Sequence, residues 1–152
     1  MTIHYRRANL EDASALACIE QACFSRPWSQ ASLEEYLADR DKKIFYVAYT
    51  HTDDIVGYMG SSFVLDEGDV TNVATLPAYR KQGIAKHLVG HVMKALGTLG
   101  VKTLFLEVRQ SNAPAIHMYT EMGFQTIAQR KHYYSHPTED AFIMSVHLGE
   151  DA

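Results

Sequence analysis

The segment 73–88 constrains the fold of this chain most, because it joins the signatures of a strand, a turn and a helix start. A short apolar stretch ends at Pro77, and the basic turn 80–83 (Arg-Lys-Gln-Gly) follows it. A helical pattern then begins at Ile84. Its apolar positions are Leu88, Val92, Leu96 and Leu99. The segment therefore predicts a strand that leads into the N-terminus of an amphipathic helix.

This junction is suited to an anion. The first turn of a helix presents unpaired backbone N–H groups and the positive end of the helix dipole, which together favour phosphate. Gly83 has no Cβ, so the backbone can approach an anion closely. Arg80, Lys81 and Lys86 add positive charge at the same point. A solvated basic turn before an ordinary helix has the same pattern, so spacing alone leaves both interpretations open.

The pattern Arg80-x-x-Gly83-x-Ala85 resembles the acetyl-CoA pyrophosphate loop of the GCN5-related N-acetyltransferase (GNAT) superfamily. Further matching motifs are Asn-Val-Ala at 72–74, Leu-Phe-Leu-Glu-Val-Arg at 104–109, and Asn112-x-x-Ala115-Ile116-x-x-Tyr119-x-x-x-Gly123-Phe124. Together they are similar to the RimI-type ribosomal-protein-alanine acetyltransferases, over about residues 24–144. Thr75-Leu76 before Pro77, and Ala85 in place of Gly, depart from the usual family pattern and affect only the loop geometry.

The resemblance implies acetyl-CoA as co-substrate and no metal. The residues that it assigns to acetyl-CoA binding are Val73, Ala74, Thr75, Arg80, Lys81, Gln82, Gly83, Ile84, Ala85, Lys86 and Asn112.

Acetyl transfer from a thioester to an amine requires a neutral amine, a polarised carbonyl and a proton for the departing thiolate. A peptide α-amine, with a pKa of about 8, loses its proton more easily than a lysine near 10.4, so a modest base suffices. Glu107 is the predicted base, directly or through water, because it lies in an apolar strand on the face opposite Leu106 and Val108. An ion pair with Arg109 is the alternative explanation for a carboxylate there.

Aromatic residues supply the remaining candidates. The resemblance assigns the proton donor to Tyr119, although an aromatic residue on such a helix also fits a core position. Trp28 and the pair Tyr133 and Tyr134 are candidates for binding the acceptor peptide. A space-filling role at a helix start for Trp28, and loop packing for the tyrosine pair, remain alternatives.

Cysteine and histidine offer other chemistry. Cys18 and Cys23 are five residues apart on one predicted helix, which suits neither a metal knuckle nor a redox pair. An acetyl-cysteine intermediate would need an activating base, and no base stands at a fixed spacing from them. His87 and His91 have a metal-compatible spacing without a third ligand, and we interpret them as surface residues.

Length and charge limit the class of protein. The 152 residues, with 47% hydrophobic content, predict a single domain over 1–148 and a frayed tail over 149–152. The formal charge of −4 disfavours a general nucleic-acid binder and favours a cationic substrate. The N-terminus has no apolar signal core, and no apolar run reaches the roughly 18 residues of a membrane span, so we expect a cytoplasmic protein without a membrane partner.

Together these features predict an α/β GNAT fold whose mixed, mostly antiparallel sheet is flanked by helices and splayed in the middle. Strands are expected at 3–7, 43–50, 55–65, 70–76, 102–109, 124–130 and 141–148. Helices are expected at 10–24, 30–39, 84–99 and 113–122, with a turn at 66–69 and a loop at 131–140.

The predicted function is acetylation of the N-terminal alanine of a ribosomal protein, by direct attack of the α-amine. A small-amine or lysine acetyltransferase on the same fold is one alternative, because the fold does not determine the acceptor. A non-catalytic acetyl-CoA-binding protein is the other.

Overall fold

The computed structural model describes residues 2–135 and 137–149, and within them seven strands form one sheet. The strands are β1 (His4–Arg7), β2 (Lys43–Tyr49), β3 (Ile55–Val64), β4 (Glu67–Thr75), β5 (Thr103–Arg109), β6 (Gln125–Tyr134) and β7 (Glu139–His147). Their order is β1-β2-β3-β4-β5-β7-β6, and every pair is antiparallel except β4 with β5. The predicted mixed, mostly antiparallel sheet is therefore confirmed.

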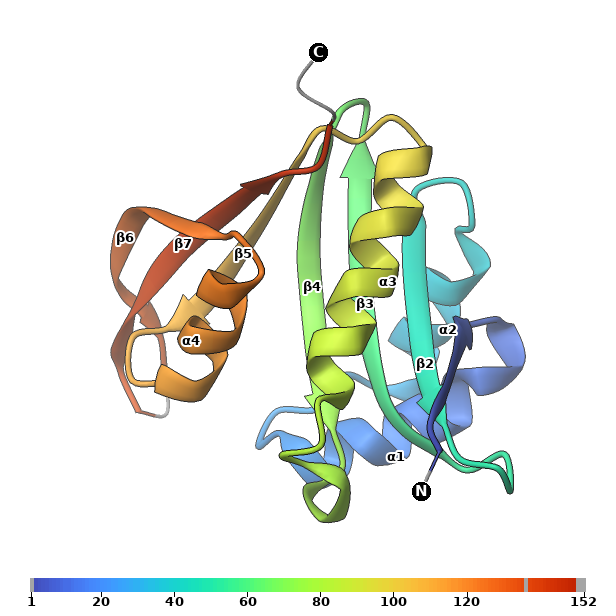
Figure 1. Ribbon diagram of the computed structural model, residues 1–152. Helices are drawn as coiled ribbons and strands as arrows, with labels where there is room; N and C mark the ends of the chain where they lie inside the picture. Colours follow the sequence, from blue (N-terminus) through green and yellow to red (C-terminus); the bar gives the residue numbers. More distant parts are fainter. Residues whose placement is uncertain (1, 136, 150–152) are drawn as a thin grey trace.

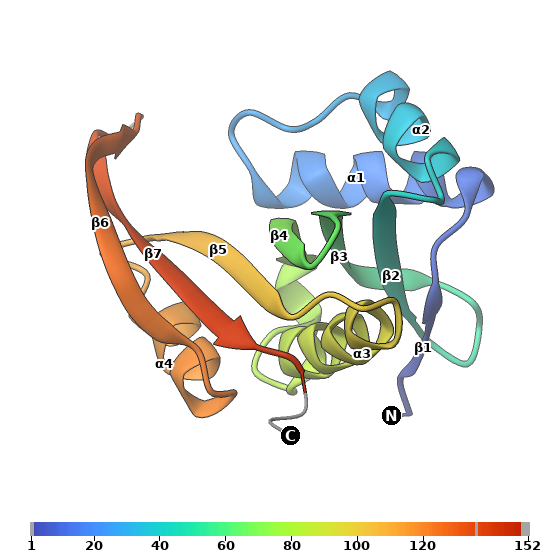
Figure 2. The same cartoon turned by 90° about the horizontal axis from the view of Figure 1, so that it is seen from above.

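Helices cover both faces of this sheet (Figures 1 and 2). They are α1 (Ala13–Cys23), α2 (Gln30–Ala38), α3 (Ile84–Thr98) and α4 (Ala113–Glu121), with 3₁₀ turns η1 (Leu10–Asp12) and η2 (Pro77–Tyr79). Figure 2 shows α1 and α2 on one side of β2 to β4, and α3 on the other. Of the apolar positions predicted for this helix, Leu88, Val92 and Leu96 are buried in the core, together with Ile84 and Val89. Leu99 follows the end of α3 and is exposed.

The sheet opens between β4 and β5 (Figure 1). The two strands pair only over Glu67–Asp69 and 103–105. On its other side β4 pairs Asn72 with Gly60 and Val70 with Ser61, so Thr71 is an extra residue in β4. Such a bulge bends a strand and increases its twist, which directs the second half of β4 away from β5. The result is the predicted splay.

Two of the predicted boundaries were wrong. The segment 67–69 is not a turn but the start of β4, and it makes all of the parallel pairing with β5. The segment 131–134 is not a loop, because β6 continues to Tyr134. Every residue of β6 except Tyr134 is exposed, so this edge strand lacks the alternation of apolar and polar residues that identifies a strand. Of the predicted frayed tail, residues 150–152 lie outside the described residues.

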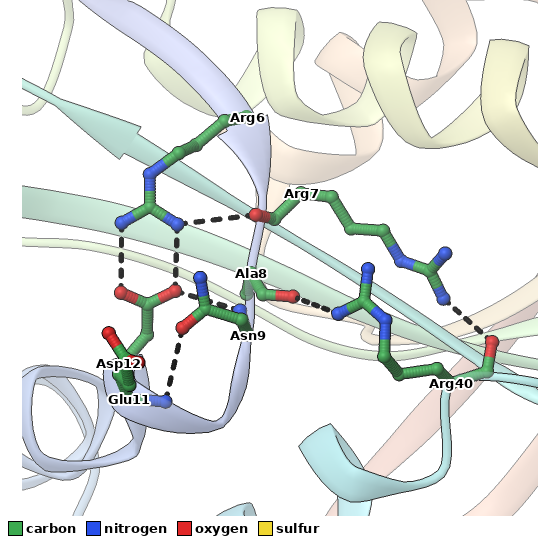
Figure 3. Close-up of polar contacts among 7 residues, drawn as sticks. All are labelled: Arg6, Arg7, Ala8, Asn9, Glu11, Asp12 and Arg40. Atoms are coloured by element: carbon green, nitrogen blue, oxygen red, sulfur yellow. Dashed lines mark hydrogen bonds and ion pairs between the residues drawn. The ribbon is translucent and has the colours of Figure 1, made fainter.

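An ion pair fastens β1 to the start of α1 (Figure 3). Arg6 donates two hydrogen bonds to the Asp12 carboxylate, of 2.8 and 2.9 Å. Asp12 also accepts from the backbone N–H of Asn9 at 2.8 Å, and the Asn9 side chain accepts in turn from the N–H of Glu11. Burial alone raises the pKa of Asp12, but the hydrogen bonds from Arg6 and Asn9 outweigh it and hold this pKa below its usual 3.8.

A second pair of contacts joins β1 to the segment between α2 and β2 (Figure 3). Arg7 donates to the carbonyl of Arg40 at 2.7 Å, and Arg40 donates to the carbonyl of Ala8 at 3.0 Å. The N-terminal edge of the sheet is therefore held by side chains as well as by strand pairing.

Candidate active site

The opening between β4 and β5 forms a cleft of about 980 Å³. It is lined by the end of α1 and the α1–α2 loop, by the second halves of β4 and β5, by α4, and by the end of β6. The cleft therefore lies at the predicted splay of the sheet.

Six of the eleven residues assigned to acetyl-CoA line this cleft: Val73, Ala74, Thr75, Arg80, Ala85 and Asn112. The other five do not line it. They are Lys81, Gln82, Gly83, Ile84 and Lys86, which form the turn before α3 and its first residues. Ile84 points into the core, with 2% of its surface exposed, so only its backbone can meet a ligand.

The N-terminus of α3 has no side-chain cap. Gly83 occupies the cap position with φ of 80°, and no side chain accepts from the first-turn N–H groups. Lys81 is also left-handed, with φ of 65°. A turn of this kind can gather successive N–H groups around one point, which makes a concave anion site. The cap position is therefore suited to a pyrophosphate.

The cleft-facing edge of β4 has further unsatisfied groups. Beyond Asp69, β4 has no pairing with β5, so its edge N–H and C=O groups, apart from the Thr75 carbonyl, are available to a ligand. The buried Thr75 hydroxyl has no hydrogen-bond partner among the described residues. Arg80 donates to the Thr75 carbonyl at 3.0 Å. These residues fit a long ligand that has an anionic end and an amide-containing arm. Acetyl-CoA has both features.

Glu107 lies on β5 with its side chain 34% exposed. It does not pair with Arg109, which contradicts the alternative explanation: Arg109 pairs with Glu139 at 3.1 Å. The nearest cation is Arg130, whose guanidinium lies 3.9 Å from the Glu107 carboxylate. A hydrogen bond with Glu107 is the main reason why the pKa of Tyr133 is raised. This carboxylate is therefore accessible from the cleft and bordered by an aromatic hydroxyl.

Tyr119 is both a cleft residue and a core residue. It lines the cleft, yet only 6% of its surface is exposed, and its ring packs edge-on against Phe124 at 5.3 Å between centroids. Burial, with a smaller contribution from Tyr134, raises the pKa of Tyr119 to about 12. The phenol of Tyr119 therefore keeps its proton at neutral pH. At the start of the same helix, Asn112 also lines the cleft, and it caps α4 by accepting from the N–H of Ala115 at 3.2 Å.

Aromatic side chains line the two sides of the cleft. Trp28 lies in the α1–α2 loop, and its ring packs against that of Tyr36 in a tilted arrangement, with 4.7 Å between centroids. Tyr133 and Tyr134 end β6 on the opposite side and meet edge-on at 5.0 Å. Burial, followed by the charge of Glu107, raises the pKa of Tyr134 to about 12. The structure thus brings the three acceptor candidates to one cleft, with Glu107 and Tyr119.

Arg109 is a residue that the sequence interpretation assigned only to pairing with Glu107. It donates to the carbonyls of Pro137 and Ser135, both at 3.1 Å, and lies 4.4 Å from the centre of the Tyr134 ring. Glu139 continues the contact by accepting from the N–H of Ser111 at 2.8 Å. These contacts hold the β6–β7 hairpin against the start of α4.

The sequence interpretation also missed Glu20, which is 2% exposed and lines the back of the cleft. Its signal was its place four residues after Leu16, on the buried face of α1, where a carboxylate is unusual.

Of the cysteines and histidines considered above, Cys23 lines the cleft, whereas Cys18, His87 and His91 do not. Cys18 and Cys23 are free thiols. The Cys23 sulfur lies 3.4 Å from the Thr75 carbonyl oxygen and 3.6 Å from an Arg80 nitrogen. His87 and His91 are exposed, as predicted, and both stack on Tyr5. Within residues 2–135 and 137–149, no group of three or more potential metal-binding side chains is found, and no helix is long and apolar enough to cross a membrane.

Known proteins resemble the chain in sequence and in fold. The profile of the Acetyltransferase (GNAT) family matches residues 13–124. The [ribosomal protein bS18]-alanine N-acetyltransferase of Haemophilus ducreyi is 38% identical over 141 residues, which cover 91% of this chain and 95% of that protein. The Escherichia coli enzyme of the same name is 34% identical over 139 residues, covering 89% and 90%.

Solved structures agree with these matches. The crystal structure of the ribosomal-protein-S18-alanine N-acetyltransferase from Escherichia coli superposes with a TM-score of 0.89 and 30% identity, covering 99% of this chain and 97% of that one. Arabidopsis thaliana NAA60, solved in complex with acetyl-CoA, shares the fold with a TM-score of 0.86, at 20% identity and coverage of 96% and 98%. The chain belongs to the GNAT family and is an acetyl-CoA-dependent N-acetyltransferase.

Proposed function

We propose that this enzyme acetylates the α-amine of an N-terminal alanine, with the ribosomal protein bS18 as its acceptor, by direct attack on the thioester. The observation that carries the proposal is that Glu107 and Tyr119 share one cleft, between an anion site at α3 and the aromatic residues Trp28, Tyr133 and Tyr134. The names of relatives that are 34–38% identical over most of the chain support the choice of acceptor.

Acetyl-CoA supplies the activated acetyl group. The uncapped N–H groups of α3, together with Arg80, Lys81 and Lys86, bind the pyrophosphate. The free edge of β4 over 73–75 and the Asn112 side chain bind the pantetheine arm, and a backbone N–H of this edge polarises the thioester carbonyl. This edge is available because the bulge at Thr71 has separated β4 from β5.

Proton transfer is assigned to two side chains. Glu107 accepts the proton of the attacking amine, directly or through water, and its partial exposure lets either route operate. Tyr119 is protonated at neutral pH, because its pKa is raised to about 12, and it donates a hydrogen bond to the departing sulfur. An acetyl-cysteine intermediate on Cys23 is less well supported, because its recorded polar contacts are a carbonyl and a guanidinium rather than a base.

The acceptor side of the proposal rests on charge and shape. The chain carries a formal charge of −4, which favours the cationic N-terminus of a peptide. Trp28 on one side and Tyr133 on the other leave an aromatic-lined channel between them, which suits an extended peptide end. We place this reaction in the cytoplasm, where ribosomal proteins are made.

Mass spectrometry of peptides incubated with the protein and acetyl-CoA tests the proposal. One peptide carries the bS18 N-terminus with a free α-amine, and the matched peptide has a blocked α-amine and an internal lysine. We expect acetylation of the first peptide only. Modification of the lysine peptide alone would make the enzyme a lysine acetyltransferase, and modification of neither peptide, with acetyl-CoA bound, would contradict acetylation of this N-terminus.

A further inference from the structure

A buried carboxylate lies behind the acceptor side of the cleft, at Glu20. It is the one acidic residue that faces the core from α1, and it is 2% exposed. Moving a carboxylate out of water is costly unless hydrogen bonds replace the lost hydration. The partners of Glu20 therefore indicate what this carboxylate holds in place.

Donors from three different segments converge on Glu20. One carboxylate oxygen accepts from the backbone N–H of Trp28 at 2.8 Å. The other accepts from the Tyr58 hydroxyl on β3 at 2.5 Å and from the Asn72 amide on β4 at 3.4 Å. The Asn72 amide also donates to the Tyr58 hydroxyl. One side chain of α1 thus ties the α1–α2 loop to β3 and β4.

Asn72 connects Glu20 to β4 next to the bulge of that strand. Asn72 directly follows the extra residue Thr71, where β4 turns away from β5, and it is followed by the cleft-lining residues 73–75. A Cβ on Gly60, opposite Asn72, would lie only 2.5 Å from the Asn72 amide oxygen. Gly60 therefore leaves the space that the Asn72 side chain needs to reach Glu20 and Tyr58.

The Trp28 ring is held by a second route that ends at the same tyrosine. The Trp28 ring packs at a tilt against Tyr36, with 4.7 Å between centroids. Tyr36 stacks on Phe45, and Phe45 stacks on Tyr58, both with 6.2 Å between centroids. The Glu20 bond holds the Trp28 main chain, and the stack holds its ring. Glu20 also lines the cleft, whereas Tyr36, Phe45 and Tyr58 do not.

We propose that Glu20 is a positioning residue for acceptor binding: its carboxylate holds the Trp28 N–H, and thereby fixes the α1–α2 loop as the acceptor side of the cleft. Glu20 takes no proton from the amine and does not bind acetyl-CoA in this role. The inference rests on the proposed acceptor site at Trp28 but not on the identity of the acceptor, since any amine that enters the cleft passes this loop.

The variant Glu20→Gln tests the role. Its amide has one acceptor oxygen and an NH₂ group, so the three donors compete for a single acceptor. Because Tyr58 and Asn72 meet at one oxygen, that oxygen stays with them, and the Trp28 N–H loses its partner. With the loop ordered only part of the time, the KM for the acceptor rises about tenfold, while the KM for acetyl-CoA and kcat stay within about twofold.

Trp28 is the only tryptophan in the chain, so its fluorescence reports on the loop without any acceptor. We expect acrylamide to quench Trp28 more strongly in Glu20→Gln than in the unmodified enzyme. Tyr58→Phe is the matched control, because it also removes buried hydrogen bonds of the cluster but leaves the bond between Glu20 and the Trp28 N–H in place. It should lower the melting temperature and leave both the quenching and the acceptor KM unchanged.

Three results would overturn the proposal: unchanged quenching in Glu20→Gln, equal increases in the KM values for acceptor and acetyl-CoA, or the same changes in Tyr58→Phe. If Glu20→Gln does not fold, Glu20→Asp, which withdraws the carboxylate from Trp28 by one methylene, is measured in the same assays with the same expected outcomes. If the bS18 peptide is not an acceptor, the proposed function fails, and the quenching comparison still decides the role of Glu20.

Discussion

The substitution Tyr119→Phe removes one hydroxyl from the cleft and preserves the ring that packs against Phe124. The fold should therefore survive, with a melting temperature close to that of the unmodified enzyme. Any loss of activity then reports on the hydroxyl alone.

The size of the loss follows from the pKa of Tyr119. Its rise from 10.0 to about 12 means that burial disfavours the phenolate. With a thiol pKa near 8.5, complete transfer of the Tyr119 proton to a free thiolate is uphill by roughly 3.5 pKa units, or about 5 kcal/mol. In the proposed mechanism, Tyr119 therefore acts mainly by donating a hydrogen bond as the carbon–sulfur bond breaks. Removal of one such donor lowers kcat by about 10²- to 10³-fold, which corresponds to about 3–4 kcal/mol.

Single-turnover quenched-flow kinetics with saturating acetyl-CoA measures this step without interference from product release. We expect the chemical step to be slower in Tyr119→Phe than in the unmodified enzyme, and the affinity for acetyl-CoA to stay within about twofold of the unmodified value. Tyr46→Phe, a matched change far from the cleft, should leave the rate unaffected. In the unmodified enzyme, the loss of the Tyr119 proton should not reduce the rate below about pH 11, because the pKa of this phenol is raised. A rate in Tyr119→Phe within threefold of the unmodified value would refute this reasoning.

Three further substitutions test other parts of the structure. Glu107→Gln should lower kcat/KM for the peptide by roughly 10²-fold at pH 7. Above pH 9 an α-amine with a pKa of about 8 is neutral without a base, so pH–rate profiles should show a smaller loss there. A loss that stays constant with pH would contradict a role of Glu107 as base. Gly83→Ala places a Cβ on a residue with φ of 80°, which costs about 1 kcal/mol, and it should raise the KM for acetyl-CoA several-fold. The control Gly90→Ala, inside the same helix, should leave this KM unchanged. Equal effects of the two substitutions would exclude a special role for the cap residue. Asp12→Asn should lower the free energy of unfolding in urea by about 1–3 kcal/mol at pH 7. The folded-state pKa of Asp12 lies below 3.8, so the stabilisation by its carboxylate is present above pH 3.8 and is lost as the pH falls through the folded-state pKa. A difference between the two proteins that does not shrink as the pH falls below 3.8 would be inconsistent with the ion pair to Arg6.

The helices were predictable because their signals are local. Ser29 and Asn112 cap α2 and α4 as their residue types suggest, and the periodic apolar residues of α3 are all buried except Leu99. Strand ends were harder to predict. Glu67–Asp69 have the composition of a turn, and they form a strand because β5 pairs with them from a distant part of the chain. The exposed strand β6 had no apolar pattern to detect.

The candidate site likewise has one part with a local sequence signal and another part that depends on contacts between distant residues. The anion site expected at α3 rests on a contiguous motif, and it stays a prediction. The Glu20 cluster could not be predicted from the sequence, since its donors lie 8, 38 and 52 residues further along the chain. Periodicity indicates that such a residue is buried but does not identify its partners. Arg109 is similar, because its contacts with the β6–β7 hairpin depend on a strand whose extent was not visible in the sequence.

The missing side-chain cap on α3 has a consequence for the lifetime of the protein. In the proposed complex, the pyrophosphate of acetyl-CoA satisfies the first N–H groups of this helix, because Gly83 has no side chain that could do so. A metabolite that binds the folded chain alone stabilises it by about 2.7 kcal/mol at a concentration 100 times its Kd. Starvation that depletes both acetyl-CoA and free CoA should therefore shorten the half-life of the enzyme by exposing it to proteases, before any change in its synthesis.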